Sequence, residues 1–113
     1  MKTMHKGNFL ELVPNIPENF VWKCDDSGLV TFEKENKGVF NRLAQLIIRK
    51  PKVSYIHLDE YGSFVWQQID GVRNITDIGV AVKEHFGEKV EPLYERLATY
   101  FKTLESYNFI VLA

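Results

Sequence analysis

The sequence has a single cysteine, Cys24, among 113 residues. One thiol can form neither an internal disulfide nor a cysteine-rich metal site. The three histidines are isolated, and HExxH and CxxC spacings do not occur, so no zinc site is expected. GxSxG, GxGxxG and GxxxxGK[ST] are also lacking, which removes the usual signs of a nucleophile elbow, a dinucleotide site and a phosphate loop. We therefore expect no enzyme, no metal and no cofactor.

Long apolar runs are missing as well. None could cross a bilayer, and none follows the basic N-terminus as it would in a signal peptide, so we expect a cytoplasmic protein. The length accommodates one domain with one core. The net charge is −1, but residues 1–52 carry nine Lys and Arg against six Asp and Glu, whereas residues 53–113 carry five against nine.

The first half of the chain has a β pattern. Pro14 and Pro17 interrupt residues 1–19, so we expect an N-terminal arm without regular structure. Around the turn "DDSG", the segments "NFVWKCD" and "LVTFEKE" alternate in polarity, which predicts a hairpin. Residues 38–51 have a helical apolar stripe that ends at Pro51, and "KVSYIHL", residues 52–58, predicts a third strand.

Three more apolar stripes predict helices over 60–69, 77–86 and 92–107, followed by a short strand, "FIVL". Asp59 and Thr76 are the expected N-caps, with Ile75 and Val80 forming a hydrophobic staple at the second helix. Gly71 and Gly87 are available to end helices. The pattern predicts an α+β fold of the winged-helix type, in which a small N-terminal sheet precedes three helices. Helix 38–51 is inserted between strands two and three.

The stretch "HLDEYGSFVWQQIDG", residues 57–71, gathers a histidine, three acids and a serine. Asp59 is assigned as a cap, Glu60 lies in the first helical turn, and Asp70 belongs to the turn that ends the helix. Each polar residue thus has a structural role. We interpret this stretch as the junction between a strand and a helix rather than as a catalytic cluster.

Winged-helix proteins commonly place a basic helix in the DNA major groove. Helix 92–107 carries two acids and two bases and is neutral, which does not suit a surface that must neutralise phosphates. Arg42, Arg49 and Lys50 form a basic cluster on the inserted helix instead, and we regard them as candidates for docking a partner. A DNA-binding regulator is kept as the alternative function.

From "YIHLDEYGSFVWQQIDGVRNITDIGVAVKEHFG" onward the chain resembles the PqqD family. The resemblance lies in a strand that ends in Leu58, a polar cap, an aromatic helix, the Asp70–Gly71 pair and the helix beginning around Thr76. The hairpin "FVWKCDDSGLVTFE" also matches. The resemblance covers about residues 20–113 and implies a PqqD-like winged-helix domain there, preceded by the arm.

This resemblance implies a non-enzymatic peptide chaperone, a recognition element for the leader of a ribosomally made precursor peptide. Such proteins present the peptide to a modifying enzyme, often a radical S-adenosylmethionine enzyme, and the family is named for coenzyme PQQ synthesis. The peptide is implied to add as a strand beside the third strand, against the third helix. The implied strand-edge residues are Val53, Ser54, Tyr55, Ile56 and His57, and the implied helix wall is Tyr94, Leu97 and Phe101.

Two segments leave alternatives open. Helix 38–51 either packs on the sheet and leaves the third strand free, or covers that edge, or offers a docking face to the enzyme. Arm 1–19 could exchange strands with a second copy and produce a homodimer. A further alternative is a relative that has lost peptide binding and serves only as a scaffold.

Overall fold

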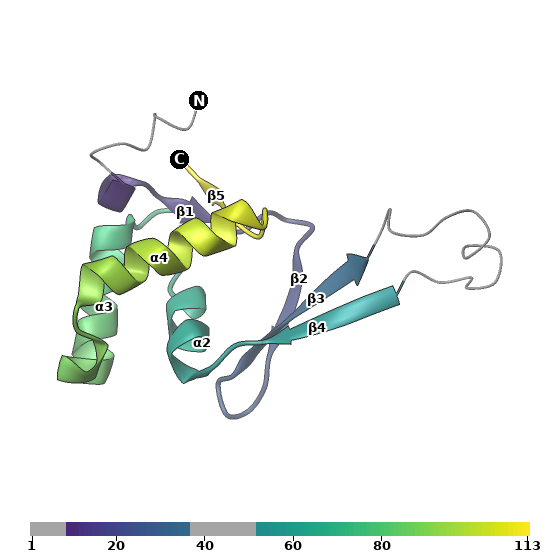
Figure 1. The fold of residues 1–113 in the computed structure, drawn as a ribbon, viewed down its shortest axis with the longest axis horizontal. Coiled ribbons are helices and arrows are strands. Elements are labelled where there is room, and N and C mark those ends of the chain that lie inside the picture. The colour runs from purple at the N-terminus through teal and green to yellow at the C-terminus, as the bar shows by residue number, and fades with distance from the viewer. Residues whose placement is uncertain (1–8, 37–51) are drawn as a thin grey trace.

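The computed structural model describes residues 9–36 and 52–113. Those residues form an α+β fold with a small antiparallel sheet and three helices (Figure 1). The expected helix 38–51, together with Arg42, Arg49 and Lys50, lies outside the described residues. In the described ranges, none of the helices has the length and apolar character needed to span a membrane.

The elements follow the order that the sequence predicts over most of the chain. The strands are β1 (Pro14–Asn15), β2 (Val21–Cys24), β3 (Val30–Asn36), β4 (Lys52–His57) and β5 (Val111–Leu112). The α-helices are α2 (Glu60–Gln67), α3 (Ile75–Phe86) and α4 (Leu93–Ser106), with short 3-10 helices η2 (Phe9–Glu11) and η3 (Gly87–Val90). Figure 1 shows the three helices packed together, with β3 and β4 extending away from them.

The main sheet has the order β2-β3-β4, and all its pairs are antiparallel. The predicted hairpin turn is confirmed. The Asp25 carboxylate accepts hydrogen bonds from the Ser27 and Leu29 backbone N–H groups at 2.8 and 3.0 Å, and Gly28 has φ +86°. This φ lies in the left-handed region, which glycine adopts without a Cβ clash. The turn therefore fixes the register of β2 on β3.

The second, two-stranded sheet was not predicted. β1 pairs with β5 antiparallel, with Pro14 opposite Leu112. Val13 and Ala113 exchange both of their backbone hydrogen bonds, at 2.8 and 3.1 Å. Pro14 thus occupies the neighbouring position, where its missing N–H does not interrupt the ladder. The expectation that the prolines prevent any regular element is wrong at Pro14, whereas the division into an arm and a domain stays a prediction.

The helix caps agree with the sequence at α2 and differ at α3. Asp59 caps α2 by accepting a hydrogen bond from the Gly62 N–H at 2.7 Å, as predicted. At α3 the N-cap is Asn74, whose side chain accepts from the Asp77 N–H at 2.8 Å. The predicted cap Thr76 lies inside the helix and donates to the Leu10 carbonyl at 3.1 Å. The staple is also wrong, because Ile75 is the first helical residue and Val80 is exposed.

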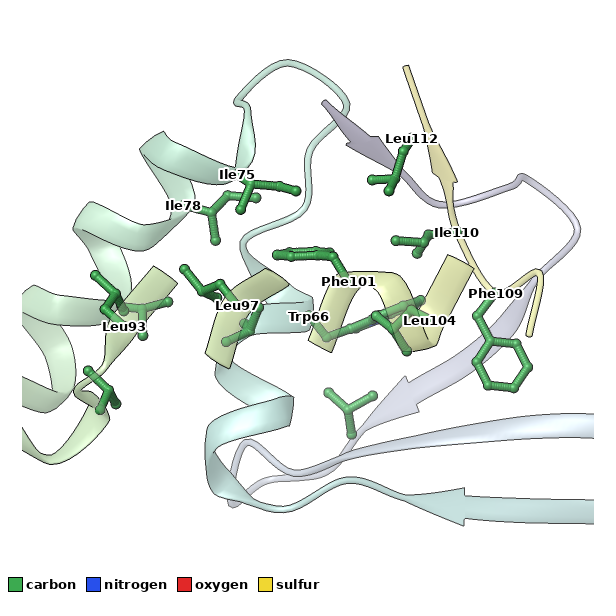
Figure 2. Close-up of a cluster of buried hydrophobic side chains, with 14 of the residues drawn as sticks. Trp66, Ile75, Ile78, Leu93, Leu97, Phe101, Leu104, Phe109, Ile110 and Leu112 are labelled. Atoms are coloured by element: carbon green, nitrogen blue, oxygen red, sulfur yellow. The ribbon is translucent and has the colours of Figure 1, made fainter. Parts of the chain in front are cut away.

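The core lies where the three helices meet the sheet. Trp66 of α2 and Phe101 of α4 have no exposed surface, and Phe32 of β3 lies 4.4 Å from the Trp66 ring, measured between centroids. Figure 2 shows the α4 side chains Leu97, Phe101 and Leu104 gathered around Trp66. A fully buried side chain of this size contributes roughly 1.5–3 kcal/mol through the hydrophobic effect. The core therefore holds one face of α4, and the neighbouring face of the helix lies beside the sheet.

Candidate functional site

A groove of about 450 Å³ separates the sheet from α4. Its size falls within the range of small-ligand and side-chain pockets. The strand side of the groove consists of Phe32, Lys34, Ile56 and Leu58, and the helix side consists of Tyr100, Thr103, Leu104, Tyr107 and Phe109. Most of these side chains are apolar or aromatic, so the groove suits extended, largely apolar groups better than charged ones.

One side of β4 borders no other described strand, because β4 is the last strand in the order β2-β3-β4. Leu58 N–H donates to the Val30 carbonyl at 2.9 Å. In an antiparallel pair the bonding direction alternates along the strand. Ile56 and Ser54 therefore also direct their main-chain groups toward β3, whereas Val53, Tyr55 and His57 direct theirs away from it. These three residues provide the outward row of donors and acceptors.

The side chains of β4 alternate in the same way. Ser54 and Ile56 are partly buried, whereas Val53, Tyr55 and His57 are exposed, with Tyr55 at 55%. His57 Nδ1 lies 3.0 Å from Thr31 Oγ1 on the neighbouring strand. The predicted third strand is therefore confirmed, and its side chains alternate between two faces, as expected of a β-strand. The inner face meets the groove at Ile56, and the outer face carries Tyr55.

Tyr100 anchors the helix side of the groove. Its hydroxyl donates to the Gly62 carbonyl at 2.7 Å. Burial raises the pKa of Tyr100, with smaller contributions from Tyr61 and Asp59, so the phenol stays protonated and remains a donor. A Cβ at Gly62 would lie 3.5 Å from the Tyr100 ring, which is an ordinary contact, but only 3.1 Å from Asp59 Oδ1, so the glycine leaves room chiefly for the cap of α2. The Tyr100 ring is thus fixed between α2 and α4.

The second tyrosine of the helix side, Tyr107, lies at the end of α4 and is 58% exposed. Its ring stacks on Phe109 with the centroids 5.4 Å apart, and Lys34 Nζ lies 6.0 Å from each of the two centroids. An exposed tyrosine combines apolar area with a polar tip. Tyr107 can therefore contact a ligand in the groove while Phe109 holds its ring in place.

A second cavity, of about 400 Å³, lies farther along α4. Tyr61, Glu95, Arg96, Thr99 and Tyr100 line it. Tyr100 belongs to both cavities, so the two meet at this residue. Burial raises the pKa of Tyr61, and its buried hydroxyl has no hydrogen-bond partner in the part of the chain that the structure describes. The second cavity is therefore aromatic on the α2 side and polar on the α4 side.

The residues implied for the helix wall lie elsewhere on α4. Leu97 and Phe101 have no exposed surface and belong to the core, and the Tyr94 hydroxyl lies 3.4 Å from the Thr76 carbonyl of α3. The residues that face the groove are Tyr100, Thr103 and Tyr107, which sequence reasoning missed. Their i, i+3, i+7 spacing beside the core stripe, with tyrosine at both ends, is the signal that could have identified them.

The polar residues of the stretch 57–71 have structural partners. Asp59 caps α2, and the buried Ser63 accepts a hydrogen bond from the Val30 N–H at 2.8 Å. Asp70 accepts from the N–H groups of Val72 and Arg73, both at 2.9 Å. Over residues 9–36 and 52–113, no group of three His, Cys, Asp or Glu side chains is arranged to hold a metal ion. These contacts support the interpretation of the stretch as a fold junction.

A comparison with protein families identifies one match. The model of the family described as coenzyme PQQ synthesis protein D (PqqD) matches residues 45–110, which is more than half of the chain and includes β4, the three helices and most of the residues that line the two cavities. No curated protein and no solved structure shows significant similarity to the chain. The resemblance drawn from the sequence is thus confirmed, and the chain belongs to the PqqD family.

Proposed function

We propose that this protein is a non-enzymatic adaptor that binds a segment of a ribosomally made precursor peptide and presents it to a modifying enzyme of the radical S-adenosylmethionine type. In this proposal residues 20–113 act as a winged-helix-type recognition element. The peptide adds as a strand along β4 and lies against α4. Membership of the PqqD family supports this role, and so does the combination of an outward strand edge with an apolar groove.

The observation that carries the proposal is the outward row of Val53, Tyr55 and His57 beside the 450 Å³ groove. Strand addition draws affinity from main-chain hydrogen bonds and specificity from pockets for alternate side chains. Alternate side chains of a strand lie roughly 6.6 Å apart. The groove would receive the inward side chains of the peptide, next to Ile56 of β4.

The contact residues follow from this geometry. Main-chain groups of Val53, Tyr55 and His57 would pair with the peptide, and Ile56, Tyr100, Thr103 and Tyr107 would contact its inward side chains. Leu97 and Phe101 hold α4 from the core side, so their contribution is indirect. The adaptor raises the effective concentration of the peptide at the enzyme, which requires no chemistry from its own side chains.

The test replaces one outward N–H. Phage-displayed twelve-residue peptides of randomised sequence are selected on the wild-type protein, and the affinity of the strongest binder is measured by fluorescence anisotropy. Tyr55→Pro removes a main-chain donor from the β4 edge and places a ring beside the incoming strand. Because one such hydrogen bond contributes about 0.5–1.5 kcal/mol and the ring adds a clash, we expect at least about tenfold weaker binding.

The matched control is Cys24→Pro. Cys24 is an exposed residue at the end of β2, and the alternation of the β2–β3 ladder directs its N–H away from β3 at the opposite edge of the sheet. Its proline variant should bind the peptide within about twofold of wild type, since a proline is tolerated where an edge N–H faces solvent. Circular dichroism confirms that both variants fold. Equal binding by Tyr55→Pro and wild type would contradict strand addition at β4.

A further inference from the structure

The second cavity extends the groove beyond the end of β4. Arg96, Tyr100, Thr103 and Tyr107 recur at intervals of four, three and four along α4 and line the two cavities in turn. Residues at this spacing share one helix face, and the stripe spans roughly 16 Å at 1.5 Å per residue. β4 lies opposite its C-terminal part, and Tyr61 of α2 lies opposite its N-terminal part. A peptide that pairs with β4 and continues past its end would therefore pass Arg96.

Arg96 is held in place without an acidic partner among residues 9–36 and 52–113. Its guanidinium carbon lies 4.5 Å from the Tyr61 ring centroid, and Nη1 donates to the Lys89 carbonyl at 3.1 Å. The ion pairs among the described residues involve Arg73 and Lys83 and do not include Arg96. Glu95 also lines the cavity and does not pair with Arg96. The cation is thus oriented by an aromatic face and a carbonyl, with guanidinium donors left over.

A fixed guanidinium with spare donors is suited to a carboxylate, which it can bind through two parallel hydrogen bonds. The contact with Tyr61 reduces the rotational freedom that an arginine otherwise loses when it binds. Thr99 places a hydroxyl in the same cavity. Unmodified precursor peptides supply carboxylates through Asp and Glu side chains. The group that Arg96 is suited to bind is therefore one that the proposed peptide ligand can carry.

We infer that the second cavity receives an Asp or Glu side chain of the precursor peptide, held by Arg96 beyond the segment that pairs with β4. This inference rests on the proposed peptide-binding function and adds a selectivity for charge. Tyr100, shared by the two cavities, separates the apolar position from the acidic one. Glu95 repels a carboxylate that is not seated at Arg96, which restricts the acid to one position.

The experiment selects phage-displayed twelve-residue peptides of randomised sequence on wild-type protein and on Arg96→Glu. The wild-type pool should be enriched in Asp or Glu at a fixed distance from its apolar anchor. The Arg96→Glu pool should lose this preference and gain Lys or Arg at the same position. Lys102→Glu is the matched control, since Lys102 lies on α4 over the Phe9 ring, away from the groove, and should leave the acidic preference unchanged.

Affinities of the selected peptides supply the second measurement. Changing the enriched acid to its amide should weaken binding to wild type about tenfold and leave binding to Arg96→Gln unchanged, whereas Glu95→Gln should strengthen binding of the acidic peptide. A wild-type pool that binds without any acidic preference would overturn the inference and leave peptide binding intact. Failure of the wild-type protein to select any peptide would overturn both.

Discussion

Ser63 links the sheet to the helices, and its replacement by alanine gives a quantitative test of the fold. Its side chain is 1% exposed, and Oγ accepts a hydrogen bond from the Val30 N–H at 2.8 Å. Val30 has no exposed surface, so its N–H has no access to bulk water. Ser63→Ala leaves this donor unpaired, which costs about 1–3 kcal/mol. Alanine recovers about 0.5 kcal/mol through its higher helix propensity.

The net loss is therefore about 1.5 kcal/mol. Unfolding entropy averages about 2.1 cal/mol/K per residue, so a chain of 113 residues has about 0.24 kcal/mol/K. Dividing the loss of free energy by this unfolding entropy predicts that Ser63→Ala lowers Tm by about 6 °C. The measurement is differential scanning calorimetry at neutral pH. Because Val30 begins β3, the same variant should loosen the junction that positions β4 beside α4.

Ser106→Ala is the control for this substitution. Ser106 is exposed and its hydroxyl donates to the Thr103 carbonyl at 2.7 Å, so the lost hydrogen bond can be replaced by water. Its Tm should change by less than about 2 °C, as for most surface substitutions. If Ser63→Ala melts as the wild type does, the hydrogen bond to Val30 is not what joins the sheet to α2, and the reasoning fails.

Two further predictions concern helix ends. Asn74→Ala should reduce the free energy of unfolding by about 1 kcal/mol in urea titrations, because it removes the α3 cap, and a larger loss in Thr76→Ala would contradict this assignment. The N–H groups of Arg73 and Val72 hold the pKa of Asp70 below its ordinary value. Its stabilising contribution is therefore complete above the unfolded value of about 3.9 and is lost as the pH falls through the folded value. Asp70→Asn should show a smaller loss of Tm between pH 7 and pH 3 than wild type. Equal losses of Tm in the two proteins would contradict the stabilising role of the Asp70 carboxylate.

The sequence predicts elements well wherever periodicity is strong. The turn at Gly28, the alternation along residues 53–58 and the apolar stripes of all three described helices follow from local patterns. The pairing of β1 with β5 does not, because it joins two-residue strands from the two ends of the described chain. Such a contact depends on the packing of the whole domain, and nothing in the proline-containing segment indicates it.

The helix side of the groove was missed for a related reason. A stripe such as Leu97, Phe101 and Leu104 identifies the buried face of α4, but periodicity does not say which flank of that face lies beside the sheet. Tyr100 and Tyr107 are on that flank, whereas Tyr94 is on the α3 side. At the start of α3, Asn74 and Thr76 are both capping residue types, and only the position of the first helical turn distinguishes them.

The two ends of β3 differ in how they are held. Val30 and Phe32 are buried among the helices, whereas Lys34 is exposed. Amide protons should therefore exchange with solvent slowly near Val30 and progressively faster toward Asn36, without unfolding of the helical half. A strand laid along β4 would slow exchange most at the outer end of the sheet, so deuterium uptake there reports occupancy of the β4 edge.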